Sequence, residues 1–428
     1  MTDHEQGAER PSWPAGGYAA GLTRRAMIQR TAGSAAALSG AGWLLAACGS
    51  SSTKTSSIAT SSNPDVPIAS KDHPLTLPMY SDNVAIPPGR SPEKGPLIIY
   101  DWAEYLSPAV VKSFEERYGV TAQVTTFAAI DEAIDKVSSG AVKPDVWVPD
   151  ANHVAQLVEA KVIQPINHSY IPNLSNVIPA AADPWYDQGA RYSSPNFINL
   201  FGIAWRNDLL KIDPGSLSSP WDAFWDAPKG TSIGLVNAGP FDAIQMAMLR
   251  AGNDGLDSVS QKDITDAAAQ LAELKGAKWQ YTSFQPLGAG IEKLAYAFNG
   301  DMMVVPENLS KGTPLSSVSF YFPPDGKGPI LNDLWVIPKT AAHPVLAHLW
   351  MNHFLETQSA IDNFRDVGYQ TMLTDLTKEK LIAAKVGPAH AIDMAFATAA
   401  DQENGYPTPI FNTQQLTWIE SSFAQLTA

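Results

Sequence analysis

The stretch LIIYDWAEYLSPAVVKSFEERYGVTAQVTTF, residues 97–127, decides the fold. Its first four residues are apolar and predict a short buried strand. Ser107 is followed by proline, which is typical of a helix N-terminus, and apolar side chains recur every four residues over 110–118, on one helix face. Residues 120–127 then alternate loosely and predict a second strand. The stretch therefore predicts a strand, a helix and a second strand in succession.

Strands and helices keep alternating after this unit. Apolar spacing predicts a helix over 130–137, a strand over 146–148 and a helix over 152–160. Strands that alternate with helices are typical of an α/β fold with a mostly parallel sheet. In such sheets, ligands bind beyond the carboxyl ends of the strands.

Acidic and aromatic residues follow two of these strands at the carboxyl edge. Asp101, Trp102, Glu104 and Tyr105 follow the first strand, and Asp150 follows the third. Acids near a helix N-terminus also stabilise the helix dipole without any ligand, so a purely structural role is the alternative. Because carboxylates pair with ammonium groups and aromatic faces attract cations, we interpret this edge as a binding site for a cation.

The remainder of the chain continues the α/β pattern and is long enough for two lobes. We expect further strands at 202–210, 231–236, 302–305, 318–322 and 333–337, and helices at 242–251, 263–275 and 344–357. No internal repeat is visible.

The N-terminal 95 residues differ from the rest of the chain. Paired arginines at 24 and 25 precede a weakly apolar run, so residues 1–47 read as an export signal of the twin-arginine type. Leu45-Ala46-Ala47-Cys48 resembles a bacterial lipobox, and Cys48, the only cysteine, is predicted to carry a lipid. Residues 48–95 are rich in Ser, Thr, Pro and Gly and predict a disordered tether. The protein is then anchored to a membrane without spanning it.

The charge composition of the chain limits the kinds of ligand and partner that it can bind. The chain has 29 Lys+Arg against 43 Asp+Glu, a net charge of −14. Nucleic acid requires a basic face, so we expect no nucleic-acid binding. A positively charged ligand suits this balance better.

Two other motifs have ordinary explanations. Residues 230–234, GTSIG, match a nucleophile pattern, but that pattern needs a strand before the serine and a helix after it. Here a loop precedes Ser232 and a strand follows, so we predict no enzyme. His343, His348 and His353 recur every five residues and diverge around a helix axis, so we expect helix-surface histidines and no metal site.

The chain from about residue 96 onward resembles the bacterial spermidine/putrescine-binding family of ABC-importer solute receptors. The resemblance rests on segments that recur in the family's order: YDWAEYLSPAVVKSFEERYGV, PDVWVPD, GIAWRNDLL, PWDAFW, IQMAMLR, NDLWVIPK and VGYQT. It implies the periplasmic-binding-protein-like fold, with two α/β lobes and the ligand cleft between them. Lobe one would comprise 96–203 and 332–377, and lobe two 204–331 and 378–428.

The resemblance also implies roles for individual residues. Trp102, Glu104 and Tyr105 would surround a polyamine, Asp333 would hold an amine, and Asp242 and Tyr369 would complete the box. Two family tryptophans fall on Pro306 and Leu331, and a second acid falls on Gly239. The family's Ser-x-Tyr falls on 150–152, so Asp150 and Glu307 are expected to supply compensating charge.

Together with the N-terminal signal and Cys48, the resemblance predicts a monomeric, lipid-anchored receptor on the outer face of the cytoplasmic membrane, in the periplasm or at the cell surface. It would capture a small cationic amine, such as putrescine or spermidine, by hinge closure and dock on ABC permease subunits, with no cofactor. Another amine, an amino acid or an opine-like solute is the alternative ligand. A sensor lipoprotein on the same fold is the alternative function.

Overall fold

A computed structural model describes residues 73–236, 241–252, 259–280, 282–409 and 411–427. The predicted export signal, Cys48, Gly239 and the first part of the predicted tether lie outside the described residues. Among the helices that the structure describes, none is both long and apolar enough to cross a bilayer.

The first strand, helix and strand form as predicted. β1 (Leu97–Trp102) and β2 (Ala122–Phe127) pair in parallel, and α2 (Pro108–Tyr118) connects them. The Ser107 hydroxyl caps α2 by accepting a hydrogen bond from the backbone N–H two residues on, at 3.2 Å. Gly119 ends the helix with a φ of +65°, a left-handed conformation that suits glycine.

The sheet continues from this unit in the order β2-β1-β3-β10-β5-β8-β6-β7. α3 (Ile130–Ser138) leads to β3 (Val146–Trp147), which pairs in parallel with β1, and α4 (Ala151–Glu159) follows. Parallel pairing of β1 and β3 brings the segments that follow both strands to one edge, as predicted.

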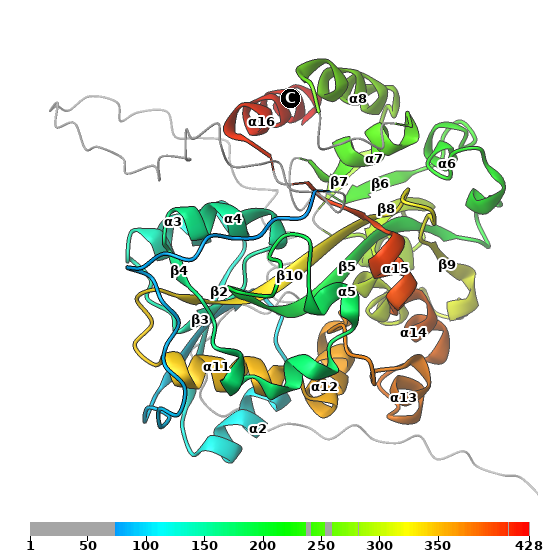
Figure 1. Ribbon diagram of the computed structural model, residues 1–428. Helices are drawn as coiled ribbons and strands as arrows, with labels where there is room; N and C mark the ends of the chain where they lie inside the picture. Colours follow the sequence, from blue (N-terminus) through cyan, green and yellow to red (C-terminus); the bar gives the residue numbers. More distant parts are fainter. Residues whose placement is uncertain (1–72, 237–240, 253–258, 281, 410, 428) are drawn as a thin grey trace, which may run out of the picture. The chain divides into compact units, whose positions relative to one another are not determined.

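Two long antiparallel strands connect the halves of the sheet. β5 (Ser193–Arg206) pairs with β10 (Pro329–Pro338) as far as Leu200, and from Phe201 it pairs with β8 (Leu294–Phe298). The strands on either side form two α/β lobes, which confirms the predicted fold (Figure 1). The lobe boundaries given above remain predictions.

The second lobe contains the parallel strands β6 (Ile233–Val236) and β8, with β7 (Lys278–Gln280) beside β6. The predicted strand at 302–305 is wrong. A 3₁₀ turn, η5 (Gly300–Met303), and α10 (Val305–Asn308) occupy these positions. Proline at 306 suits the start of a helix and cannot donate to a strand ladder.

The remaining elements lie outside the argument that follows. The helix predicted over 344–357 forms as α11 (Pro344–Phe354), and a further helix, α12 (Thr357–Val367), begins at the end of the predicted range. The other helices are α5 (Pro179–Ala182), α6 (Asp222–Trp225), α7 (Asp242–Arg250), α8 (Gln261–Glu273), α9 (Phe284–Gly288), α13 (Lys378–Ala383), α14 (Ala389–Ala395), α15 (Ala399–Asn404) and α16 (Thr413–Thr427). The other strands are β4 (Ile163–Gln164), β9 (Val318–Tyr321) and β11 (Tyr406–Pro407).

Helices cover both faces of the first lobe's sheet (Figure 1). On one face α3 and α4 pack over a core that includes Tyr100, Trp147 and Leu334. On the other face α11 packs onto β10, where Trp335 and Trp350 meet edge to face with ring centroids 5.6 Å apart. Helices therefore cover both faces of this sheet, and the carboxyl edge of its strands is the part where a ligand can bind.

Residues 73–95, which we call the strap, are ordered along the first lobe, so the predicted tether extends too far. The N–H of Leu75 donates to the carbonyl of Trp185 at 2.7 Å, and the carbonyl of Leu75 accepts a hydrogen bond from the N–H of Gln188 at 3.0 Å. Leu77 is 1% exposed and belongs to the core beneath α3 and α4. Glu93 accepts hydrogen bonds from two N–H groups in the first turn of α11. The composition of residues 73–95 does not reveal these contacts, because they are made with residues of the first lobe that lie far away in the sequence.

Candidate binding site at the carboxyl edge of the sheet

A tight turn after β1 presents the aromatic and acidic residues of the predicted site. Glu104 has a φ of +63°, an uncommon conformation for a residue with a side chain. The N–H of Tyr105 donates to the carbonyl of Trp102 at 3.3 Å. Trp102 packs on Phe127 with centroids 4.5 Å apart, so its ring extends the core.

Tyr105, Asn199 and Asp333 form one hydrogen-bonded group. The Tyr105 hydroxyl lies 3.0 Å from Asn199 Oδ1 and 3.0 Å from Asp333 Oδ2. Asn199 Nδ2 donates to the same Asp333 Oδ2 at 2.7 Å. These side chains come from the turn after β1, from β5 and from β10, so the group joins three strands at their edge.

Aromatic rings surround this group. Tyr105 packs 5.2 Å from Phe197 and 5.2 Å from Tyr369, centroid to centroid. Tyr369 also meets Phe298 of the second lobe at 6.4 Å. Gly300 lets the Tyr369 ring approach, because a Cβ there would lie 2.3 Å from the ring. These rings, which we call the ring wall, extend from Tyr105, whose hydroxyl faces Asp333, to Phe298 in the second lobe.

Three acids gather at this edge: Asp101, Asp150 and Asp333, which are at most 8% exposed. With Tyr105 and Asn199 they make up what we call the acid cluster. Asp150 and Asp333 face each other across an isolated antiparallel bridge. Asp150 is paired with His153 at 2.5 Å, and that histidine side chain is 21% exposed.

Burial controls the charge of these acids. Burial, together with the nearby charge of Asp150, raises the pKa of Asp333 to about 7, despite the hydrogen bonds from Asn199 and Tyr105. Complete burial, with a smaller contribution from Asp333, raises the pKa of Asp101 well above its usual range. Oδ1 of Asp101 accepts the N–H of Trp102 at 2.7 Å, and Oδ2 has no hydrogen-bond partner among the described residues. A cation placed here would lower the electrostatic cost of ionising these groups.

The model of the bacterial extracellular solute-binding protein family matches residues 109–389, more than half of the chain. The chain belongs to this family.

Curated relatives of this solute-binding protein are named for their ligands. It is 26% identical to the spermidine/putrescine-binding periplasmic protein of Escherichia coli over 296 residues, 68% of this chain and 80% of that protein. It is 24% identical to the putrescine/cadaverine-binding protein of Pseudomonas aeruginosa over 281 residues, 64% of this chain and 78% of that protein. These relatives are binding proteins and not enzymes, which agrees with the prediction for this chain.

Solved structures show the same fold. The substrate-binding protein of a spermidine/putrescine ABC transporter from Streptococcus pneumoniae superposes with a TM-score of 0.64 at 20% identity, covering 77% of this chain and 98% of that one. A lipoprotein of Treponema pallidum superposes with a TM-score of 0.61 at 20% identity, with the same coverage. At this identity the likeness concerns the fold alone.

The structure brings most of the predicted site residues together in this solute-binding protein. Asp101, Tyr105, Asp150, Asp333 and Tyr369 meet at the acid cluster or its ring wall. Trp102 packs beside the same turn, and Glu104 lies half-buried within it.

The two remaining predicted acids lie in the second lobe. Asp242 is the first residue of α7, and its carbonyl accepts a hydrogen bond from Tyr296. Glu307 is exposed on α10. Neither side chain takes part in the hydrogen bonds described above for the first lobe, so their roles remain predictions.

Sequence reasoning missed Asn199 and Phe197. Both lie within the almost wholly buried strand β5, where no motif or turn marks them. Asn199 is 2% exposed, and a buried amide must find hydrogen-bond partners. An asparagine inside a buried strand that crosses between lobes is the signal that could have identified it.

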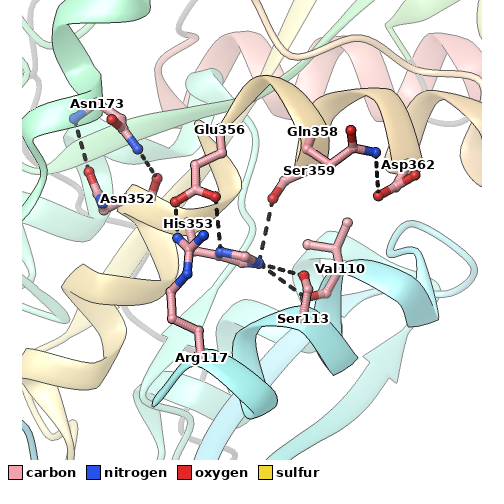
Figure 2. A network of polar contacts seen from close by, with 10 residues as sticks. All are labelled: Val110, Ser113, Arg117, Asn173, Asn352, His353, Glu356, Gln358, Ser359 and Asp362. Carbon is pink, nitrogen blue, oxygen red and sulfur yellow. Dashed lines mark hydrogen bonds and ion pairs between the residues drawn. The ribbon is translucent and has the colours of Figure 1, made fainter. Parts of the chain in front are cut away.

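The expectation of helix-surface histidines is wrong for two of the three. His348 and His353 are 0% and 2% exposed, because α11 is apolar on nearly every side and is buried as a whole. His353 Nε2 lies 2.9 Å from Ser113 Oγ, and His353 Nδ1 lies 3.6 Å from Glu356, which also pairs with Arg117 (Figure 2). We call Ser113, Arg117, His353 and Glu356 the histidine network.

Proposed function

We propose that this solute-binding protein captures a small cationic amine, a polyamine such as putrescine or spermidine, for an ABC importer. The acid cluster is the observation that carries the proposal. Three buried carboxyl groups meet there, and the one basic side chain paired with them within the described residues is His153, on Asp150. Burying an ionised carboxylate without a cation is costly, so a bound ammonium group completes the site.

The ring wall supports the same class of ligand. Tyr105, Tyr369 and Phe197 provide ring faces next to Asp333. Aromatic faces attract cations and also cover the methylene groups of an aliphatic amine. The curated relatives named above bind spermidine, putrescine or cadaverine, which agrees with this chemistry.

Hinge closure is the proposed mode of capture. Asp333 stands on β10, one of the two strands that connect the lobes, and acids of the second lobe, Asp242 and Glu307, would supply the facing charge. A ligand that contacts both lobes stabilises the closed form by the difference between its closed and open contacts. Permease subunits would then recognise the closed form, and the receptor would act as a monomer.

The proposed location of the protein is the outer face of the cytoplasmic membrane. It rests on the twin-arginine-type signal over 1–47 and on lipidation of Cys48. Replacing Cys48 with serine should move the protein from the membrane pellet to the soluble fraction after cell lysis. Unchanged membrane retention of that variant would refute the lipid anchor.

A thermal-shift experiment on the purified protein tests the ligand. Putrescine, cadaverine, spermidine, spermine and agmatine are compared with neutral amino acids and opines. At about a thousandfold excess over its dissociation constant, a ligand adds ~4 kcal/mol to the folded state, which raises the melting temperature by several degrees. Stabilisation by one or two amines supports the proposal. A response confined to neutral or anionic solutes would contradict it.

A further inference from the structure

The Tyr105 hydroxyl has one hydrogen and two acceptors within reach. Asn199 Oδ1 and Asp333 Oδ2 both lie 3.0 Å from it. Asn199 Nδ2 donates to Asp333 Oδ2 at 2.7 Å, which fixes the orientation of the amide. The Asn199 N–H₂ group therefore donates to the Asp333 carboxylate, whereas the Tyr105 hydroxyl can donate either to the Asn199 amide oxygen or to that carboxylate.

The two carboxylate oxygens of Asp333 differ in their hydrogen bonds. Oδ2 receives the amide N–H and faces the hydroxyl, whereas no described residue donates a hydrogen bond to Oδ1. The residue lies where the pairing of β10 with β5 shifts register, between Asn332 and Leu334. Two residues of β5, 196 and 197, lie opposite the single Asp333 there, so the extra residue belongs to β5. The hydrogen bonds at Oδ2 are therefore what fixes the direction of the Asp333 oxygens.

We propose that Asn199 is a positioning residue that holds the Asp333 carboxylate in its ionised form and leaves Oδ1 for the ammonium group of the ligand. This inference rests on the proposed function. The amide is neutral and cannot accept the carboxyl proton at this contact, because it presents its N–H₂ group to Oδ2. It therefore favours the charged form of Asp333, which alone attracts an ammonium ion strongly.

The other groups around Asp333 act in the opposite direction or are weaker. Asp150, across the bridge, and Asp101, on β1, are like charges that favour the neutral acid. His153 is directed to Asp150 instead. Tyr186 is buried, and the charges of Asp187 and Asp333 help to keep its hydroxyl protonated. Asn199 and Tyr105 are thus the described side chains that donate to Asp333 and stabilise its charge.

The test is the pH dependence of amine affinity. The dissociation constant of putrescine, or of the amine that stabilises the protein most, is measured by calorimetry from pH 6 to pH 9 for wild type and Asn199→Leu. We expect the variant to bind about 10- to 100-fold more weakly at pH 7, the range for a hydrogen bond to a charged group. We expect its affinity to recover toward pH 9, so that the midpoint of the profile rises.

Two further variants keep the test decisive. Tyr105→Phe should shift the midpoint in the same direction by less, because Asn199 still donates, and it serves if Asn199→Leu does not fold. Asn352→Leu removes an amide that pairs with Asn173 away from the cluster, and it should leave the midpoint unchanged. A wild type that binds no amine at any pH refutes the proposed function. Wild-type binding with an unshifted midpoint in both Asn199→Leu and Tyr105→Phe refutes the role of Asn199 alone.

Discussion

The first lobe contains two groups of polar residues that differ in how their charges are balanced. In the histidine network, Arg117 and Glu356 neutralise each other and the imidazole of His353 lies between Glu356 and Ser113 (Figure 2). In the acid cluster, Asp101 and Asp333 are buried without a cationic partner among the described residues. A balanced network is what stability alone requires, so the unbalanced one indicates a place for a ligand.

The two groups also respond to pH in opposite ways. Burial lowers the pKa of His353 in the histidine network, and it lowers the pKa of His348, on the same helix, to about 4. Both histidines cost stability as pH falls below the unfolded value near 6.5. Asp333, with a pKa of about 7, costs stability as pH rises from about 4 to 7.

The largest expected effect concerns ligand affinity. Asp333→Asn keeps the size of the side chain but removes the charge that an ammonium group would meet. We expect the affinity for the amine to fall by ~2–5 kcal/mol, the usual loss when one partner of a desolvated charge pair is removed. Calorimetric titration measures it, and Asp266→Asn, the same charge change on the exposed face of α8, is the control. Equal affinities for wild type and Asp333→Asn would remove the acid cluster from the site.

The second effect concerns stability without ligand. Asp333→Asn should unfold at a higher temperature than wild type at pH 8, and the difference should shrink toward pH 4. The expected difference at pH 8 is of the order of a few kcal/mol, since each unit of pKa shift corresponds to about 1.4 kcal/mol. Melting curves of the ligand-free proteins across this range provide the measurement. A difference that does not change with pH would mean that burial does not raise the pKa of Asp333 in the empty receptor.

A smaller effect is expected in the balanced network. His353→Ala removes the buried imidazole that Ser113 and Glu356 face and should lower the free energy of unfolding by ~1–3 kcal/mol. Amine affinity should stay within about twofold of wild type, because the network is separate from the acid cluster. Denaturant unfolding and calorimetry on the same sample distinguish the two quantities. A large loss of affinity with unchanged stability would reverse the assignment of the two groups.

The smallest effect separates the hydroxyl from the imidazole. Ser113 Oγ donates to the carbonyl of Val110 at 3.0 Å besides facing His353. Ser113→Ala should lower the free energy of unfolding by ~0.5–1.5 kcal/mol, the usual net value of one hydrogen bond. Unfolding curves measured in parallel with those of His353→Ala show whether the alanine variant is the milder one. If it is not, the hydroxyl and not the imidazole organises the network.

Sequence patterns located the three acids of the acid cluster because these acids follow strands or stand in family motifs. Asp101 and Asp150 follow neighbouring parallel strands, and parallel pairing brings those ends together whatever the rest of the chain does. Asn199 could not be located in this way, because its role depends on the antiparallel pairing of β5 with β10 and on the register shift opposite Asp333. Both are long-range features that spacing along the chain does not encode.

The histidines show how a correct pattern can be misread. A step of five residues does separate side chains around a helix, as His348 and His353 confirm by meeting different partners. However, α11 is apolar on nearly every side, and such a helix is buried all round. Divergent histidines on a helix of this kind are therefore all candidates for burial, and the apolar character of the helix was the stronger signal.

The strap has a mechanical consequence for any receptor that is held at its N-terminus. A pull applied at residue 73 would first load the contacts of Leu75 with the 185–188 segment and the bond from Arg191 to the carbonyl of Leu77. It would then have to extract Leu77 from the core. A force on the N-terminus would thus act on the contacts at the start of the strap before it reached β1. The turn that presents Tyr105 would therefore keep its conformation under this force.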